Sequence, residues 1–234
     1  MALPKLSTPE FKTKIPSTGQ EITYRPFLVK EEKILLMAME GNDQKEITNA
    51  IMGLLGNCIL EDIDVRKLAT FDIEYIFLKL RGKSVGEVIQ FKTGHVKETE
   101  CKHRSDGVIN IDDIVPIGEI KDPVIMLTDE VGVKVHYPSL ADLDGINASN
   151  ETGLIQVLTR CIDQVFDKDE VYTEFTEAEI SDWVDGLDQQ QFKKLAEFFN
   201  NMPKLAYTYK WTCKECGEED QMELEGLQSF FSLR

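Results

Sequence analysis

The residues with the clearest potential for chemistry are two cysteines late in the chain. Cys213 and Cys216 are separated by two residues, Gly217 follows directly, and strand-like segments flank this group. Thiolates at this spacing on a tight turn are typical of one half of a tetrahedral zinc site, and the glycine lets backbone N–H groups turn toward the sulfurs. A complete site needs two further ligands.

An internal near-repeat offers the two missing ligands. Cys101 and His103 lie in a polar turn that also opens with Cys-Lys and leads into an alternating segment. Two facing knuckles would form a split zinc ribbon that joins distant parts of the chain, where a crosslink stabilises most in principle. We therefore predict a structural zinc site with four ligands, Cys101, His103, Cys213 and Cys216.

The spacing of the first knuckle leaves alternatives open. Cys101-x-His103 is one residue shorter than the usual zinc knuckle, so His95, on the same predicted hairpin, is a substitute ligand. A degenerate ribbon with free thiols and no metal is the other interpretation. Redox chemistry is not expected, because a redox C-x-x-C pair normally opens a helix, whereas a strand follows Cys216.

The other residues whose side chains could take part in chemistry are assigned structural roles. Cys58 and Cys161 lie among apolar residues and are predicted to be core, and His136 is a lone histidine within a strand-like segment. The sequence contains no phosphate-binding glycine loop and no G-x-S-x-G elbow. Solvated loops and helix N-termini explain acidic clusters such as residues 61–64 and 167–170. We expect no catalytic residue, no cofactor other than zinc and no small-molecule substrate.

The charge of the chain narrows the range of partners. It has 42 acidic and 26 basic residues, a net charge of −16, and a field of this sign repels nucleic-acid phosphates and anionic lipid surfaces. No stretch approaches the roughly 20 apolar residues that span a bilayer, and the first residues lack the apolar core of a signal peptide. The odd number of cysteines favours a reducing compartment. We predict no nucleic-acid partner, no membrane association and a cytoplasmic location.

The elements that must position these residues mix helices and strands. Turn residues at 16–20 separate two alternating segments, which predicts a hairpin over residues 9–29. Apolar periodicity and capping boxes predict helices at residues 29–39, 43–57, 71–80, 154–165, 176–187 and 188–202. Alternation predicts strands at residues 85–96, 107–115, 124–138, 207–211 and 221–224.

This pattern predicts an α+β fold in a single intertwined domain spanning residues 1–234. Its expected parts are an N-terminal hairpin with helices (1–84), a β-rich segment with the first knuckle (85–140), a helical cluster (150–203), and the second knuckle with a C-terminal tail (204–234). The two strand-knuckle-strand hairpins are expected to pair as the split zinc ribbon.

Two segments resemble surfaces for protein partners. The tail from residue 226 to residue 234 carries two aromatic residues and two leucines, and we expect it to dock on its own core. In the segment 195–202, the adjacent Phe198 and Phe199 cannot both occupy the centre of one narrow helical stripe. One of them is either turned outward or accommodated by a broad core face.

Sequence strings at both ends of the chain carry a family resemblance. Near the start these are LPKLSTP (3–9), PSTGQ (16–20) and YRPFLVKEEK (24–33), and near the end they are CKECG (213–217) and LEGLQSFF (224–231). In these strings, and over most of its length, the chain resembles the T4-type bacteriophage baseplate hub subunit or hub-assembly protein family.

The resemblance implies a late viral protein made in the cytoplasm of an infected bacterial host. It implies a non-enzymatic, protein-binding or chaperone-like role in building the hub of a contractile tail, with other baseplate and hub proteins as partners. It brings no catalytic residues. Whether the protein stays in the baseplate of the virion or acts only during assembly is left open.

Two alternative functions have sequence features of their own. A zinc-ribbon module that binds nucleic acid would need Lys92, Lys97, Lys102 and Arg104 to form a basic face against the net charge of the chain. A metal-dependent hydrolase would need an open metal position. This hypothesis is motivated only by the scattered carboxylates and the predicted zinc.

Overall fold

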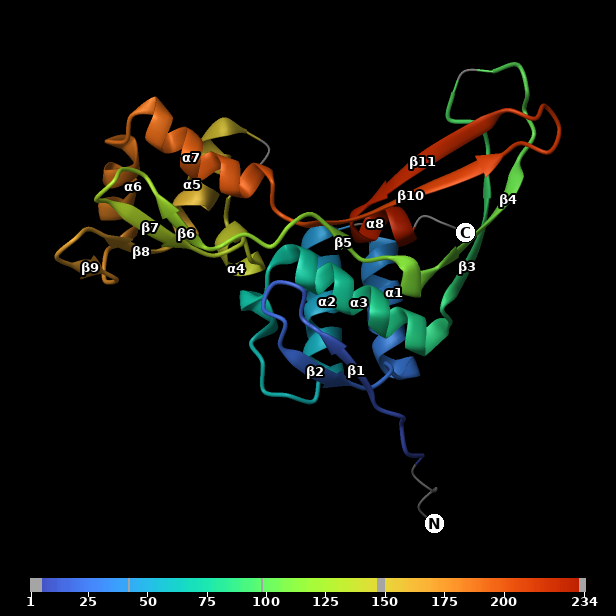
Figure 1. Cartoon of the computed structure of the whole chain (residues 1–234). Helices are drawn as coiled ribbons and strands as arrows, with labels where there is room; N and C mark the ends of the chain where they lie inside the picture. Colours follow the sequence, from blue (N-terminus) through green and yellow to red (C-terminus); the bar gives the residue numbers. More distant parts are fainter. Residues whose placement is uncertain (1–5, 42, 98, 147–149, 232–234) are drawn as a thin grey trace, which may run out of the picture. The chain divides into compact units, whose positions relative to one another are not determined.

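The chain forms two compact units, each built from segments that are separated in the sequence. The computed structural model describes residues 6–41, 43–97, 99–146 and 150–231. Unit 1 comprises Met1–Val65, Phe71–Ile117 and Lys204–Arg234, and unit 2 comprises Arg66–Thr70 and Gly118–Pro203. Both combine helices with small antiparallel sheets, which confirms the α+β class (Figure 1). The single intertwined domain stays a prediction.

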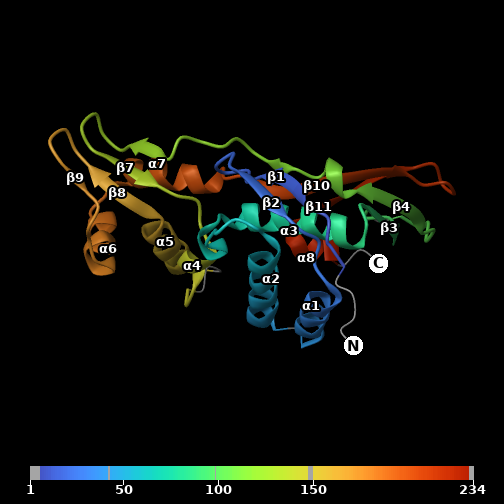
Figure 2. The ribbon, with the colours of Figure 1, turned by 90° about the horizontal axis from the view of Figure 1, so that it is seen from below.

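The first part of unit 1 is a hairpin followed by helices. Strands β1 (Phe11–Lys14) and β2 (Glu21–Tyr24) pair antiparallel, as the turn residues predicted. The helices that follow are α1 (Val29–Gly41), α2 (Gln44–Cys58) and, after the short turn η1 (Val65–Lys67), α3 (Thr70–Val85). Figure 2 shows α1 and α2 side by side. The α3 helix is the most buried of these, because Phe71, Ile76 and Phe77 are almost fully enclosed.

Two long hairpins complete unit 1 and lie side by side in Figure 1. One is β3 (Val88–Thr93) with β4 (Ser105–Asn110), followed by η2 (Ile111–Asp113); the other is β10 (Lys204–Thr212) with β11 (Glu219–Glu225), extended by β5 (Pro116–Ile117). They belong to separate sheets and meet through side chains.

The shared core of the two long hairpins comes from the inward positions of their alternating strands. Leu205 and Leu224 of one hairpin pack in a cluster with Ile89 and Phe91 of the other. The Phe91 ring also covers Gly107, where a Cβ atom would lie 2.5 Å from Phe91 Cζ, so any larger residue there would displace the ring. Leu227 of α8 (Gly226–Phe231) packs against the same cluster. The side chains of residues 230–231, and residues 232–234 altogether, lie outside the described part.

Unit 2 is a four-stranded antiparallel sheet packed against helices. The sheet order is β6 (Val124–Met126), β7 (Gly132–Val135), β8 (Ile162–Phe166) and β9 (Val171–Tyr172), and the helices are α4 (Leu140–Leu143), α5 (Glu151–Arg160), α6 (Glu177–Asp185) and α7 (Gln189–Asn200). The capping boxes predicted at Thr176 and Asp188 are both present. The helix predicted over 154–165 is shorter, because α5 ends at Arg160 and the following residues pair with β7.

Candidate metal centre

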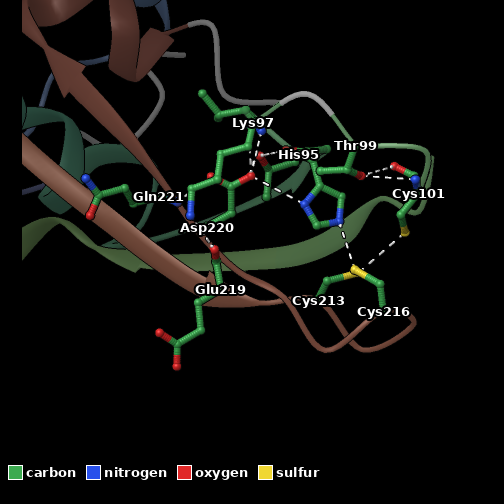
Figure 3. Close-up of polar contacts among 12 residues, drawn as sticks. His95, Lys97, Thr99, Cys101, Cys213, Cys216, Glu219, Asp220 and Gln221 are labelled. Atoms are coloured by element: carbon green, nitrogen blue, oxygen red, sulfur yellow. Dashed lines mark hydrogen bonds and ion pairs between the residues drawn. The ribbon is translucent and has the colours of Figure 1, made fainter.

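Four side chains with metal-binding atoms converge where the turns of the two long hairpins meet (Figure 3). His95 and Cys101 lie in the loop between β3 and β4, and Cys213 and Cys216 lie in the turn between β10 and β11. Their ligand atoms are all within 4.8 Å of one another. Each hairpin therefore contributes two ligands, which is the arrangement that two facing knuckles require.

The separations between these atoms suit a tetrahedral zinc ion. Cys101 Sγ is 3.9 Å from Cys213 Sγ, and Cys216 Sγ is 3.4 Å from His95 Nε2. Zinc bonds of about 2.3 Å to sulfur and 2.1 Å to nitrogen place two sulfurs about 3.8 Å apart and a sulfur and a nitrogen about 3.6 Å apart in a tetrahedron. The sulfur pair is much too far apart for a disulfide, whose bond is about 2.0 Å long.

The turn between β10 and β11 prepares its cysteines for metal binding. Gly217 adopts φ 75°, a left-handed conformation that a glycine adopts without strain, and its N–H donates to the carbonyl of Cys213 over 2.9 Å. The backbone N–H groups of Cys216 and Glu215 point at the sulfur of Cys213 and lower the pKa of that thiol to about 6. Because the thiolate is the form that binds metals, this turn holds Cys213 ready as a ligand near neutral pH.

An acidic residue that the sequence reasoning missed supports the same site. Asp220 is buried, and its Oδ2 atom lies 3.3 Å from His95 Nδ1. Burial disfavours its charged form, but hydrogen bonds from the backbone N–H groups of Gln221, Lys97 and Val96 lower the pKa of Asp220 below its ordinary value. The available signal was its inward position in the alternating strand β11, where an unpaired carboxylate would be costly.

The structure brings three of the four predicted ligands together, and His95 joins them. His103 is not part of the converging group. Its Nδ1 atom instead lies 3.1 Å from Oε2 of Glu215, and its side chain is 35% exposed. Of the two candidate histidines, the described geometry therefore gathers the substitute ligand with the thiols.

A second group of metal-binding side chains in unit 2 consists of His136, Asp142 and Cys161. His136 Nδ1 lies 2.8 Å from Asp163 Oδ1, and its Nε2 lies 3.1 Å from Asp142 Oδ2. The hydrogen bond with Asp142 and the charges of both carboxylates raise the pKa of His136, against the opposing effect of burial. Carboxylates at both ring nitrogens favour an imidazolium, which cannot bind a metal, so this group is an ion-pair network.

The remaining cysteines are core residues, as predicted. Cys58 and Cys161 are fully buried. Burial raises the pKa of Cys58 to about 11 and raises the pKa of Cys161 still further. Both thiols therefore stay protonated and unreactive at neutral pH.

The acidic clusters singled out in the sequence serve local structure. Glu61 accepts hydrogen bonds from the backbone N–H of Thr23, and Asp167 accepts them from the N–H groups of Asp169 and Glu170. Carboxylates used in this way stabilise a strand edge and a turn. Within the described part of the chain, neither cluster is among the groups of three or more side chains that could hold a metal ion.

Comparison with known proteins assigns the chain to a class. The family described as T4 bacteriophage base plate protein matches residues 8–232, nearly the whole chain. The chain therefore belongs to the T4 bacteriophage base plate protein family and is a component of a phage baseplate, which confirms the family resemblance. No curated protein and no solved structure matches it.

Family membership also indicates where the protein is located and which class of partner it has. A baseplate component belongs to the tail of the virion and interacts with other phage baseplate proteins. Within the residues that the structure describes, no helix has the length and apolar character needed to cross a membrane.

Proposed function

We propose that this chain is a non-enzymatic, protein-binding component or chaperone-like factor in assembly of the baseplate hub. The family match over nearly the whole chain carries this proposal, and the resemblance of its sequence strings to the hub-assembly family supports the hub as its place of action. The reactive side chains support the non-enzymatic role, because those described are used as candidate metal ligands, in the core or in ion pairs.

An apolar groove in unit 2 supports protein binding. It lies between α5 and α7, has a cavity volume of about 540 Å³, and is lined mainly by apolar side chains such as Leu158 and Phe192. Leu154 and Ile155 on its α5 side are 56% and 38% exposed. Phe199 lines the α7 side, while its neighbour Phe198 is buried against Tyr137. Phe198 is thus a core residue, whereas the partly buried Phe199 packs against the same core and also lines the groove.

The acidic charge of unit 2 indicates which kind of segment would bind in this groove. Unit 2 has 18 acidic and 8 basic residues, so it carries −10 of the net charge of −16. The groove itself includes the exposed Glu151 at the start of α5. We assign the groove to a segment of another baseplate protein that has apolar side chains flanked by basic residues, because such a segment matches both the groove and the field.

We propose a structural zinc ion at the convergence of the two long hairpins. Four protein ligands fill a tetrahedral ion, and a closed site of this kind stabilises a fold instead of activating water. The role of the zinc is then to fix the turns of the β3–β4 and β10–β11 hairpins to each other. This closed ligand set argues against the hydrolase alternative.

The nucleic-acid alternative gains no support from the basic residues of the first knuckle. Lys92 Nζ lies 3.9 Å from Asp106, and Lys97 Nζ donates to the carbonyl of Glu219. An acidic side chain thus lies near Lys92, and the Lys97 ammonium is used to hold the backbone at Glu219. A basic face would need both cations for phosphates. A mobility-shift assay at physiological salt is expected to show no complex, and a salt-sensitive complex would revive this alternative.

The proposed function is tested first with a deletion mutant of the phage and then with substitutions in the groove. A deletion mutant is expected to accumulate tail proteins without complete hubs, seen by electron microscopy of infected-cell extracts; normal tails would refute the proposal. Capture from infected cells with tagged protein should then recover hub proteins. Leu154→Glu should abolish that capture, whereas the matched Gln156→Glu, on an exposed position of the same helix, should not.

A further inference from the structure

The two ring nitrogens of His95 face two different chemical environments (Figure 3). Nε2 points toward the thiols and lies 3.4 Å from Cys216 Sγ, while Nδ1 lies 3.3 Å from Asp220 Oδ2. Histidines that bind metals usually present one nitrogen to the ion and the other to a carboxylate, which fixes the ring orientation and the tautomer. In His95 the two nitrogens face these two kinds of partner, although Nδ1 is buried without a hydrogen bond and meets Asp220 Oδ2 only at ion-pair distance.

Asp220 also holds the chain that carries His95. The Oδ2 atom that faces the imidazole accepts hydrogen bonds from the backbone N–H groups of Val96, over 2.8 Å, and Lys97, over 3.2 Å. Its other oxygen accepts from the N–H of Gln221 over 2.8 Å. The carboxylate is thus satisfied although its side chain is only 1% exposed, and it ties β11 to the loop between β3 and β4.

His103 lacks a comparable support. Its side chain is 35% exposed, and the Glu215 carboxylate that it faces is 68% exposed, so this pair lies in solvent, where such contacts contribute little. The side chain of His95 is 5% exposed. The protein therefore encloses and orients one of the two histidines and leaves the other at the surface.

We infer that His95, through Nε2, is the fourth ligand of the metal centre, and that Asp220 is the positioning residue that holds it there. This inference rests on the proposed zinc site. It adds a residue that is not a ligand, and it removes His103 from the ligand set.

The test uses the purified full chain and two pairs of matched variants. Each protein is titrated with Co²⁺, whose visible bands report ligand number and type, and with Zn²⁺ against a chromophoric chelator. His95→Asn is paired with His103→Asn. Asp220→Asn is paired with Glu219→Gln, which makes the same change of charge at the exposed neighbouring residue.

Wild type, His103→Asn and Glu219→Gln are expected to bind one equivalent with the same cobalt spectrum. His95→Asn should change that spectrum, because a nitrogen ligand is lost. Asp220→Asn should keep the ligands but weaken zinc binding by about 10–100-fold, the usual effect of removing a carboxylate behind a metal-bound histidine.

The outcomes separate this inference from the zinc proposal on which it rests. A wild-type chain that binds neither metal ends the zinc proposal itself. A wild type that binds zinc while His103→Asn, and not His95→Asn, loses the nitrogen ligand overturns the ligand assignment. Zinc binding by Asp220→Asn within about twofold of wild type overturns the positioning role.

A measurement on the wild-type protein covers the case in which a variant does not fold. Nitrogen-15 spectra of the histidine rings in the zinc-loaded chain should show His95 bound through Nε2 and protonated at Nδ1. A His95 ring that is free, or bound through Nδ1, would overturn the inference without any substitution.

Discussion

Removing zinc from the proposed metal centre is predicted to release the turns of the two long hairpins from each other and to lower the stability of unit 1. The ligands on the two hairpins, Cys101 and Cys213, are 112 residues apart in the sequence. A permanent crosslink that closes a loop of this length stabilises a fold by about 5 kcal/mol in the chain-entropy model, which is an upper bound for a metal clasp. Because 1 kcal/mol moves the unfolding midpoint of a chain of this size by about 2–4 °C, chelation should lower the midpoint by up to about 20 °C.

Calorimetry of zinc-loaded and chelator-treated protein measures this shift, with the metal content determined in both samples. Hydrogen exchange should locate the loss, since amides of β10 and β11 should lose protection while β7 and β8 of unit 2 keep theirs. The chelator should have no effect on Cys213→Ser, which controls for chelator bound elsewhere. Loss of one equivalent of zinc with a midpoint change under about 2 °C would refute the clasp.

Three further predictions concern the core, pH and thiol reactivity. Leu205→Ala, at a fully buried position shared by both long hairpins, should destabilise the protein by about 2–5 kcal/mol in urea unfolding; a smaller cost would mean that the hairpins do not share a core. The raised pKa of His136 contributes stability that is complete below its unfolded value of 6.5 and is lost as pH rises through the folded value. The midpoint difference between wild type and His136→Gln should therefore shrink from pH 6 to pH 9, and a constant difference would contradict it. In native protein freed of metal, iodoacetamide should label the exposed Cys216 and spare Cys58 and Cys161; mass spectrometry that finds the buried pair labelled first would refute their assignment to the core.

The parts of the fold that adjacent residues encode were predictable from the sequence. The knuckle Cys213-x-x-Cys216-Gly217 sets its own turn, because the glycine takes the left-handed conformation that closes it. Capping boxes at Thr176 and Asp188 start their helices through side chains only three residues away. Such signals depend little on the rest of the molecule.

The choice of the proposed fourth ligand depends on tertiary structure and could not be made from the sequence. The loop between β3 and β4 has no periodicity, so nothing local shows which of its histidines turns inward. The internal near-repeat favoured His103, although its spacing from Cys101 is one residue short, whereas burial and the nearby carboxylate of Asp220 favour His95. That carboxylate comes from a strand more than a hundred residues away.

The boundary between α5 and β8 is also set by long-range contacts and not by the local sequence pattern. The apolar spacing of residues 154–165 continues past the point where the helix ends, so local periodicity predicts one longer helix. Ile162 and Val165 instead pair with Val135 and Val133 of β7. The long-range ladder overrides the local pattern, and β-branched residues suit a strand.

The order in which the segments of unit 1 leave the ribosome determines when the core of unit 1 can be completed. Leu205 and Leu224 enter a core whose other buried residues, such as Leu78, Ile89 and Ile109, are made before the segment from Gly118 to Pro203. At about 5–20 residues per second, the 86 residues from Gly118 to Pro203 keep the β3–β4 hairpin without its partner for several seconds. A chain cut short within that interval has a β3–β4 hairpin whose inward residues Ile89 and Phe91 lack the cover that Leu205 and Leu224 give them.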